Sequence, residues 1–166
     1  MIFIKYFNLG LICFICFYLG NMKAGTFEKR VIELNKFQNA LLMFKSKIEF
    51  TYEPINNIFL DISKIIYENH SNIFLETLKQ DSDIYIAWKK STEELKDVNT
   101  EDKEIIKMFG KLLGKTDIKG QVSQIELTEN LIERQIEKAE SEKNKNFKLY
   151  KTMGIICGMG ICIILI

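Results

Sequence analysis

The chain of 166 residues is poor in the residues that catalytic and cofactor sites need, with one histidine and one proline in its whole length. The histidine, His70, cannot by itself form a metal-ligand set or a cysteine–histidine pair. No glycine-rich loop followed by Lys and Ser or Thr is present, so nucleotide binding is not expected. We therefore expect a protein that is not an enzyme, has no cofactor or metal and has no small-molecule substrate. The scarcity of proline and glycine, beside abundant Ile, Leu, Lys and Glu, predicts an all-α fold.

Two further absences narrow the possible partners. The 23 basic and 22 acidic residues nearly cancel, so the charge gives no indication of binding to nucleic acid. The four cysteines, Cys13, Cys16, Cys157 and Cys162, all lie near the chain ends, which excludes disulfides and thiolate metal sites from the middle. Cys13 and Cys16 have the spacing of a redox motif. Because no redox fold surrounds them, we interpret both as apolar residues of a lipid-facing helix.

The first hydrophobic stretch is residues 2–22, which are apolar apart from Lys5 and Asn8. Its length is close to the ~20 residues that a membrane-spanning helix needs. A cleaved signal peptide is the alternative, with Lys5 as its basic end. No small-residue cleavage site precedes Lys23, which favours an uncleaved anchor.

The second hydrophobic stretch is residues 153–166, which contain no charged residue. Alone, this stretch is shorter than a helix crossing the ~30 Å hydrocarbon core of a bilayer. A helix that starts near Phe147 reaches that length if Lys148 and Lys151 extend toward the lipid headgroups. We therefore predict a spanning helix, with a shallow insertion as the alternative.

Basic residues flank both hydrophobic stretches on the side facing the middle of the chain. Lys23, Lys29 and Arg30 follow the first stretch, and a group of lysines at 143–151 precedes the second. By the positive-inside rule, the middle of the chain lies in the cytoplasm. The predicted segments are an N-terminal transmembrane anchor at 1–22, a cytoplasmic helical domain at 23–150 and a C-terminal transmembrane anchor at 151–166.

Apolar residues recur at steps of three and four through the middle of the chain, which predicts a small helical bundle. Pro54 is expected to end one long helix and to lie in the first turn of the next. Thr26 is a candidate cap for the long helix, which otherwise continues from the first anchor. Asp81 or Ser82 and, further on, Thr100 are expected to cap later helices. The predicted helices lie at about 27–51, 55–66, 73–80, 83–95 and 101–113, with a last helix from 117 onward.

The last helices are joined by a short segment rich in packing and turn residues. Gly114 is expected to stop the preceding helix with a positive φ, and Asp117 to cap the next one. Trp88 is interpreted as a core anchor, with a contact to a partner as the alternative. The full pattern is Phe109-Gly110, Leu113-Gly114, Asp117, Gln121 and Ile125.

This pattern resembles that of the stage III sporulation protein AB family of endospore-forming bacteria, and the resemblance extends over nearly the whole chain with both anchors. Trp88 stands where the family tends to have tryptophan, and Pro54 lies in a segment that ends in Thr-Pro-Leu in the family. The chain departs from that segment at Lys47, where the family has an acid, at Phe50, where it has tyrosine, and at Glu53 and Ile55 on either side of the proline.

The resemblance implies a membrane protein of the mother cell, within the complex that links mother cell and forespore. The family is similar to the F-type platform proteins of type II secretion and type IV pilus systems, whose cytoplasmic domains are small helical bundles. It therefore implies a non-enzymatic platform at the lipid bilayer that engages a stage III sporulation protein AA-type ATPase and other membrane subunits of the complex. The alternative is a membrane-anchored helical sensor or signalling bundle unrelated to secretion. The family-motif positions are interpreted as structural: Pro54, Trp88, Phe109, Gly110, Leu113, Gly114, Asp117 and Gln121.

Overall fold

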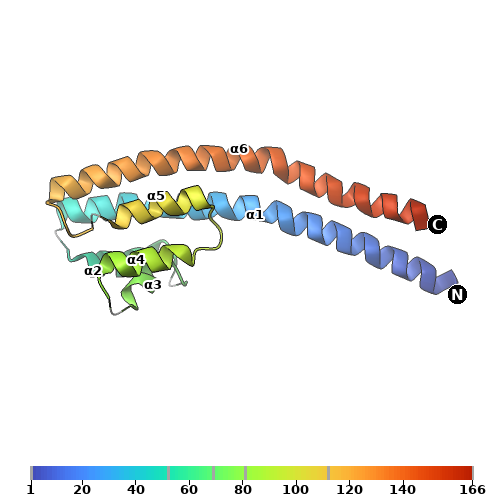
Figure 1. Cartoon of the computed structure of the whole chain (residues 1–166), viewed down its shortest axis with the longest axis horizontal. Coiled ribbons are helices and arrows are strands. Elements are labelled where there is room, and N and C mark those ends of the chain that lie inside the picture. Colours follow the sequence, from blue (N-terminus) through green and yellow to red (C-terminus); the bar gives the residue numbers. More distant parts are fainter. Residues whose placement is uncertain (1, 52, 69, 81, 112, 166) are drawn as a thin grey trace. The chain divides into compact units, whose positions relative to one another are not determined.

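The structure, a computed structural model, describes residues 2–51, 53–68, 70–80, 82–111 and 113–165, with only some of the side chains toward the two chain ends. Every regular element among these residues is an α-helix, which confirms the all-α class (Figure 1). The helices are α1 (Ile2–Phe50), α2 (Ile55–Ile65), α3 (Ile73–Leu78), α4 (Ile84–Glu93), α5 (Thr100–Gly110) and α6 (Ile118–Leu165).

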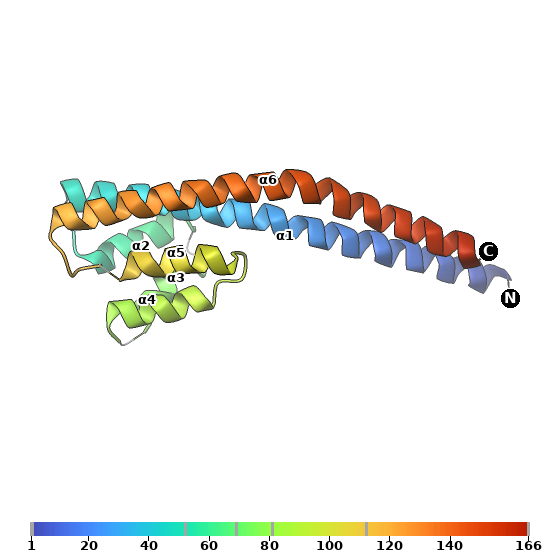
Figure 2. The ribbon, with the colours of Figure 1, turned by 45° about the horizontal axis from the view of Figure 1, so that its top comes forward.

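The described chain divides into two compact parts, one formed by the chain up to Val31 together with the chain from Lys138 onward, the other by Ile32–Glu137. In the first part, the ends of α1 and α6 run side by side (Figures 1 and 2). The Phe27 ring stacks on the Tyr150 ring with centroids 5.8 Å apart. The guanidinium group of Arg30 donates to the Glu142 carboxylate at 2.7 Å. These contacts hold the two helices together within this part.

The two hydrophobic stretches belong to α1 and α6. Among the described residues, no helix contains a segment both long and apolar enough to cross a bilayer. The side chains of Cys13, Cys16, Cys157 and Cys162, which we interpret from the sequence as apolar helix residues, lie outside the described residues.

The second part, Ile32–Glu137, has a core of aromatic and aliphatic side chains. Here α2 packs on α3, α3 on α4 and α4 on α5. The predicted apolar face of α1 is buried, as Leu34, Leu41 and Phe44 show with no exposed surface. The buried aromatic rings at the centre are Phe37, Phe44, Phe59, Phe74, Trp88 and Phe109. Burying such rings against one another stabilises the fold through both apolar area and edge-to-face contacts.

The helix starts differ in several places from the sequence predictions. Thr26 caps nothing, because α1 already runs through it from Ile2, and its hydroxyl donates to the Lys23 carbonyl oxygen at 2.7 Å. Pro54 lies at the position just before α2, where its carbonyl oxygen accepts from the N–H of Asn57 at 2.9 Å. It is therefore one residue further out than predicted, still with the fixed φ that suits a helix start.

The caps of α4 and α5 are also shifted. Asp83, and not Ser82, caps α4 by accepting from the Tyr85 N–H at 2.9 Å, while Asp81 lies outside the described residues. Asn99, and not Thr100, caps α5. Its side chain accepts from the Asp102 N–H at 2.8 Å and its own N–H donates to the Asp102 carboxylate at 3.0 Å. The Asn99 cap satisfies two otherwise unpaired donors at once, whereas Thr100 has Lys103, which carries no acceptor, at the corresponding position.

Candidate functional site

Trp88 of α4 is the centre of the aromatic core. The residue has no exposed surface, and its ring lies 5.3 Å from that of Phe74, 5.4 Å from that of Phe109 and 5.5 Å from that of Phe59. Its Nε1 donates to the Ile106 carbonyl oxygen at 2.7 Å. The indole ring and its N–H are therefore both buried in contacts within the bundle. This agrees with the interpretation of Trp88 as a core anchor and not as a contact for a partner.

Gly110, the last residue of α5, allows the Trp88 indole to lie against that helix. A Cβ at this position would come within 2.5 Å of the indole Cγ and 2.7 Å of Nε1, and closer still to Cδ1. The carbonyl oxygen that accepts from Nε1 belongs to Ile106, one turn earlier in α5. The absence of a side chain at Gly110 thus lets the Trp88 indole approach the backbone of α5. The spacing of Gly110 in the sequence does not reveal this role.

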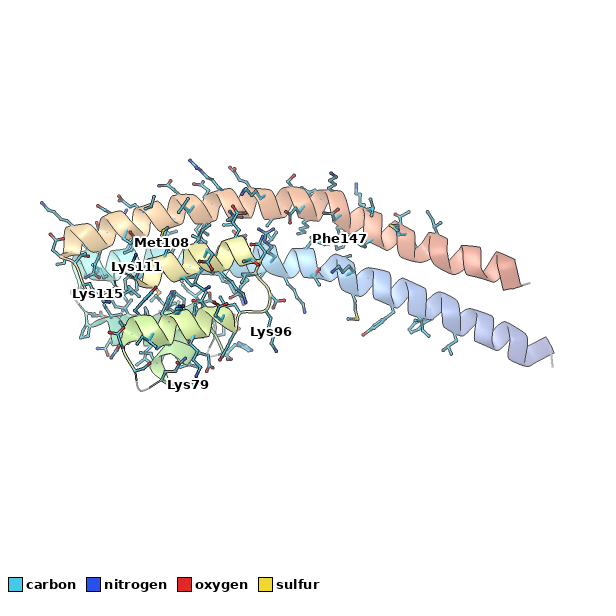
Figure 3. All side chains as sticks on the ribbon, in the orientation of Figure 1. Lys79, Lys96, Met108, Lys111, Lys115 and Phe147 are labelled. Atoms are coloured by element: carbon cyan, nitrogen blue, oxygen red, sulfur yellow. The ribbon has the colours of Figure 1, made fainter. Side chains whose placement is uncertain are left out.

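The turn between α5 and α6 contains most of the remaining motif positions. Helix α5 ends at Gly110, earlier than predicted, and the chain turns onward with the Leu113 N–H donating to the Gly110 carbonyl oxygen at 3.4 Å. Leu113 is buried and Gly114 has a φ of 70°. Because side chains strain the backbone at such a φ, glycine is required there, as the sequence predicts. Lys111 and Lys115, labelled in Figure 3, are exposed beside this turn.

Asp117 and Gln121 fix the start of α6. The Asp117 carboxylate accepts from the Gly120 N–H at 2.9 Å, which confirms the predicted cap. The Gln121 Nε2 donates to the Thr116 carbonyl oxygen at 3.0 Å, so this side chain links the first turn of α6 to the loop that precedes it. Gln121 Oε1 and Thr116 Oγ1 are buried without a hydrogen-bond partner among the described residues. The motif therefore forms one structural junction, and no reacting groups converge on it.

Lys47 connects the corner around Pro54 to α2. Its ammonium group donates to the Glu53 carboxylate at 2.9 Å and also to the Asp61 carboxylate. The hydrogen bond from Lys47 lowers the pKa of Asp61 below its ordinary value. In the opposite sense, the bonds to Asp61 and Glu53 raise the pKa of Lys47. Two of the positions where the chain departs from the family pattern, Lys47 and Glu53, thus contact each other.

The described side chains offer no cluster of three or more His, Cys, Asp or Glu residues arranged to hold a metal ion. His70 is exposed, and its Nδ1 lies 3.0 Å from the Tyr67 carbonyl oxygen. The fully buried Asp102 carboxylate is used in the cap of α5. Asp102, like Asp117, is therefore used in a helix cap.

A polar cavity of 670 Å³ lies between α1, the start of α3 and the segment after α4. Its charged lining consists of Glu33, Glu76, Glu94, Lys96 and Asp97, of which Lys96 is labelled in Figure 3. The sequence analysis did not single out any of these residues. A signal was present for Glu33, because it lies four residues before the buried Phe37 and so near the inward face of α1.

Comparisons with known proteins agree with one another. A family model described as stage III sporulation protein AB matches residues 5–166. Stage III sporulation protein AB of Bacillus subtilis (strain 168) is 25% identical over 153 residues, which cover 88% of this chain and 90% of that protein. A solved structure of stage III sporulation protein AB has a TM-score of 0.59 at 21% identity, over 70% of this chain and 98% of that chain, and shows the same fold. The resemblance predicted from the motif is confirmed.

Proposed function

The chain belongs to the stage III sporulation protein AB family, and we propose that it is a non-enzymatic membrane platform of the secretion-like complex between mother cell and forespore. The observation that supports this proposal is the extent of the family match. Residues 5–166 include the helical bundle and nearly all of both hydrophobic stretches, so the match extends over almost the whole chain. Membership supports a role in sporulation, and the platform role is the more specific part of the proposal.

The membrane part of the proposal rests on the two hydrophobic ends. Residues 2–22 and the stretch that ends the chain are long apolar runs, and both are helical where the structure describes them. Lys23, Lys29 and Arg30 follow the first run, and the lysines at 143–151 precede the second. In the proposed arrangement both runs anchor the chain in the mother-cell membrane facing the forespore, and the helical domain lies in the cytoplasm.

The partner in the proposal is a stage III sporulation protein AA-type ATPase, together with other membrane subunits of the complex. A platform needs a stable body, and the aromatic core of Ile32–Glu137 with its capped helices supplies one. It needs no reacting groups of its own, because the ATPase supplies the energy of nucleotide hydrolysis. The chain would hold the ATPase at the membrane and pass its movements to the other subunits.

The partner is tested by co-purification. The full chain is reconstituted in lipid nanodiscs, immobilised, and exposed to the purified ATPase from the same organism, with empty nanodiscs as the control. Retention of the ATPase above that control is the expected result. Failure to retain it, under conditions in which the chain is folded by circular dichroism, would refute the ATPase part of the proposal and favour a sensor or signalling bundle.

The orientation is tested by cysteine labelling. In a background with the four native cysteines replaced by serine, Ser82→Cys introduces a thiol in an exposed position before α4. A membrane-impermeant maleimide is expected to label this thiol only after cells are permeabilised. Labelling in intact cells would place the helical domain outside the cytoplasm. Release of the chain from membranes by alkaline carbonate would contradict the anchors themselves.

A further inference from the structure

The polar cavity between α1, α3 and the segment after α4 offers more hydrogen-bond acceptors than donors. The hydroxyl of Ser71 already donates to Glu76 at 2.8 Å. The side-chain amide of Asn72 donates to the Ser63 hydroxyl at 2.9 Å and to the His70 carbonyl oxygen at 2.7 Å. Ser71 and Asn72 thus use their side-chain donors within the protein, and one of these bonds goes to the lining carboxylate of Glu76.

The negative charge of the lining is only partly neutralised. Glu76 pairs with Lys79 at 2.8 Å, and both Lys79 and Lys96 are labelled in Figure 3. Glu94 and Asp97 are exposed at the cavity and form no ion pair with the described residues. A ligand that brings positive charge and N–H donors would complement this lining.

A buried tyrosine contacts one of the lining carboxylates. Tyr67 is 4% exposed and is not itself part of the cavity lining. Its hydroxyl interacts with the carboxylate of Glu33 in the lining, while Lys36 lies over the Tyr67 ring, 5.6 Å from its centroid.

We propose that this cavity binds an alkyl chain ending in an ammonium or guanidinium group, supplied by a lysine or arginine side chain of a partner protein. The volume of 670 Å³ is in the range of sites that hold small organic groups. Ile73 and Leu95 add apolar surface to the lining, against which the methylene stem of such a side chain packs. Glu33, Glu94 and Asp97 receive its charged end. The inference does not depend on the partner being an ATPase.

A change in the protonation of Glu33 gives a second measure of ligand binding. Burial raises the pKa of Glu33 above its ordinary value, and Asp97 adds to this rise while Lys36 and the Tyr67 hydroxyl oppose it. A bound cation favours the charged carboxylate and lowers that pKa. Binding is therefore expected to release protons at mildly acidic pH, and the Glu33→Gln variant should release fewer.

The test measures binding to the full chain in neutral detergent micelles by isothermal titration calorimetry at low salt. The probes are a blocked tri-arginine peptide, spermidine as a free polyamine, and a blocked tri-glutamate peptide. Tri-arginine is expected to bind and tri-glutamate not to bind. The double variant Glu94→Gln/Asp97→Asn should weaken tri-arginine binding at least tenfold.

A matched control separates a site from bulk charge. Glu133→Gln/Glu137→Gln removes the same charge from exposed positions of α6 that are not part of the cavity lining, and should change tri-arginine binding less than twofold. Equal weakening by the two double variants, or no binding of tri-arginine to the unmodified chain, would overturn the proposal. Tighter binding of spermidine than of tri-arginine would overturn the assignment to a partner side chain. Circular dichroism confirms that both double variants, which change only exposed residues, are folded.

Discussion

Replacing Gly110 by alanine adds one methyl group where the structure leaves no room for it. The new Cβ would lie 2.5 Å from the indole Cγ of Trp88 and 2.7 Å from its Nε1. Trp88 is fully buried and packed by other aromatic rings, so the indole cannot move aside freely. Either α5 shifts away from α4 or the hydrogen bond from Nε1 to the Ile106 carbonyl oxygen lengthens.

The expected loss of stability follows from three contributions. Overpacking of a core by a methyl group costs about 1–3 kcal/mol. Leaving the buried indole N–H without its acceptor adds roughly 1–3 kcal/mol if that bond breaks. Against these, alanine is favoured over glycine in a helix by at most about 1 kcal/mol. The Gly110→Ala variant should therefore be less stable by roughly 2–4 kcal/mol, a large part of the ~5–15 kcal/mol that stabilises a typical domain.

The assay is urea unfolding of the full chain in detergent micelles. Trp88 is the only tryptophan of the chain, so its fluorescence reports directly on the environment under test. The matched control is Gly25→Ala, which places the same methyl group in α1 with no atom within 4 Å. That variant should be as stable as the unmodified chain or more stable by up to about 1 kcal/mol.

A double-mutant cycle decides whether the indole is the cause. In a Trp88→Leu background the collision is absent, and Gly110→Ala should then be neutral or slightly stabilising, as measured by far-UV circular dichroism. The expected result is that the free-energy cost of Gly110→Ala disappears or reverses when the indole is absent. If Gly110→Ala costs the same free energy with and without the indole, the close approach of Trp88 to α5 is not what this glycine provides.

Three further predictions concern the turn, a cap and an ion pair, each measured by the urea midpoint of the full chain. Gly114→Ala should cost about 1–2 kcal/mol because of its φ of 70°, and Gly114→Asn should cost less; equal stability of the alanine variant would contradict the turn geometry. Asn99→Ala removes half of the reciprocal cap with Asp102 and should cost about 1 kcal/mol; an unshifted midpoint would refute this cap. The pKa of Asp61 is lowered by Lys47, so its contribution is present above the ordinary aspartate pKa and is lost as pH falls through the lower folded value. Lys47→Met should therefore reduce the loss of stability below about pH 4, and an unchanged acid profile would contradict the pair.

Much of the bundle could be predicted because apolar residues recur at helical spacing and because proline, glycine and capping residues mark several helix ends. The apolar face of α1 is buried as its spacing indicates, with Phe37 and Phe44 in the core. Pro54 separates α1 from α2 because it cannot donate in a helix. Gly114 has the positive φ expected of a stop, and Asp117 caps α6. Each of these features is decided within a few residues of the chain, which is the range that sequence reasoning covers.

The features that could not be predicted depend on choices between neighbours or on distant contacts. Ser82 and Thr100 are good capping residues, yet Asp83 and Asn99 cap α4 and α5. The position of the first buried turn decides which neighbour is used, and that position is set by packing. The role of Gly110 depends on Trp88, which belongs to another helix. Such a contact has no local signature in the sequence.

The positions that identify the family and the positions that would bind partners are different kinds of residue. Trp88, Gly110, Gly114 and Asp117 are used, respectively, for core packing, close approach, backbone conformation and capping. Each of these roles is fulfilled by contacts within the chain, so we expect substitutions there to act first on the stability of the fold. Contacts with other subunits should instead depend on exposed side chains such as those at the mouth of the acidic cavity. Their charge can be removed with the core intact, and a loss of binding then reports on the surface itself.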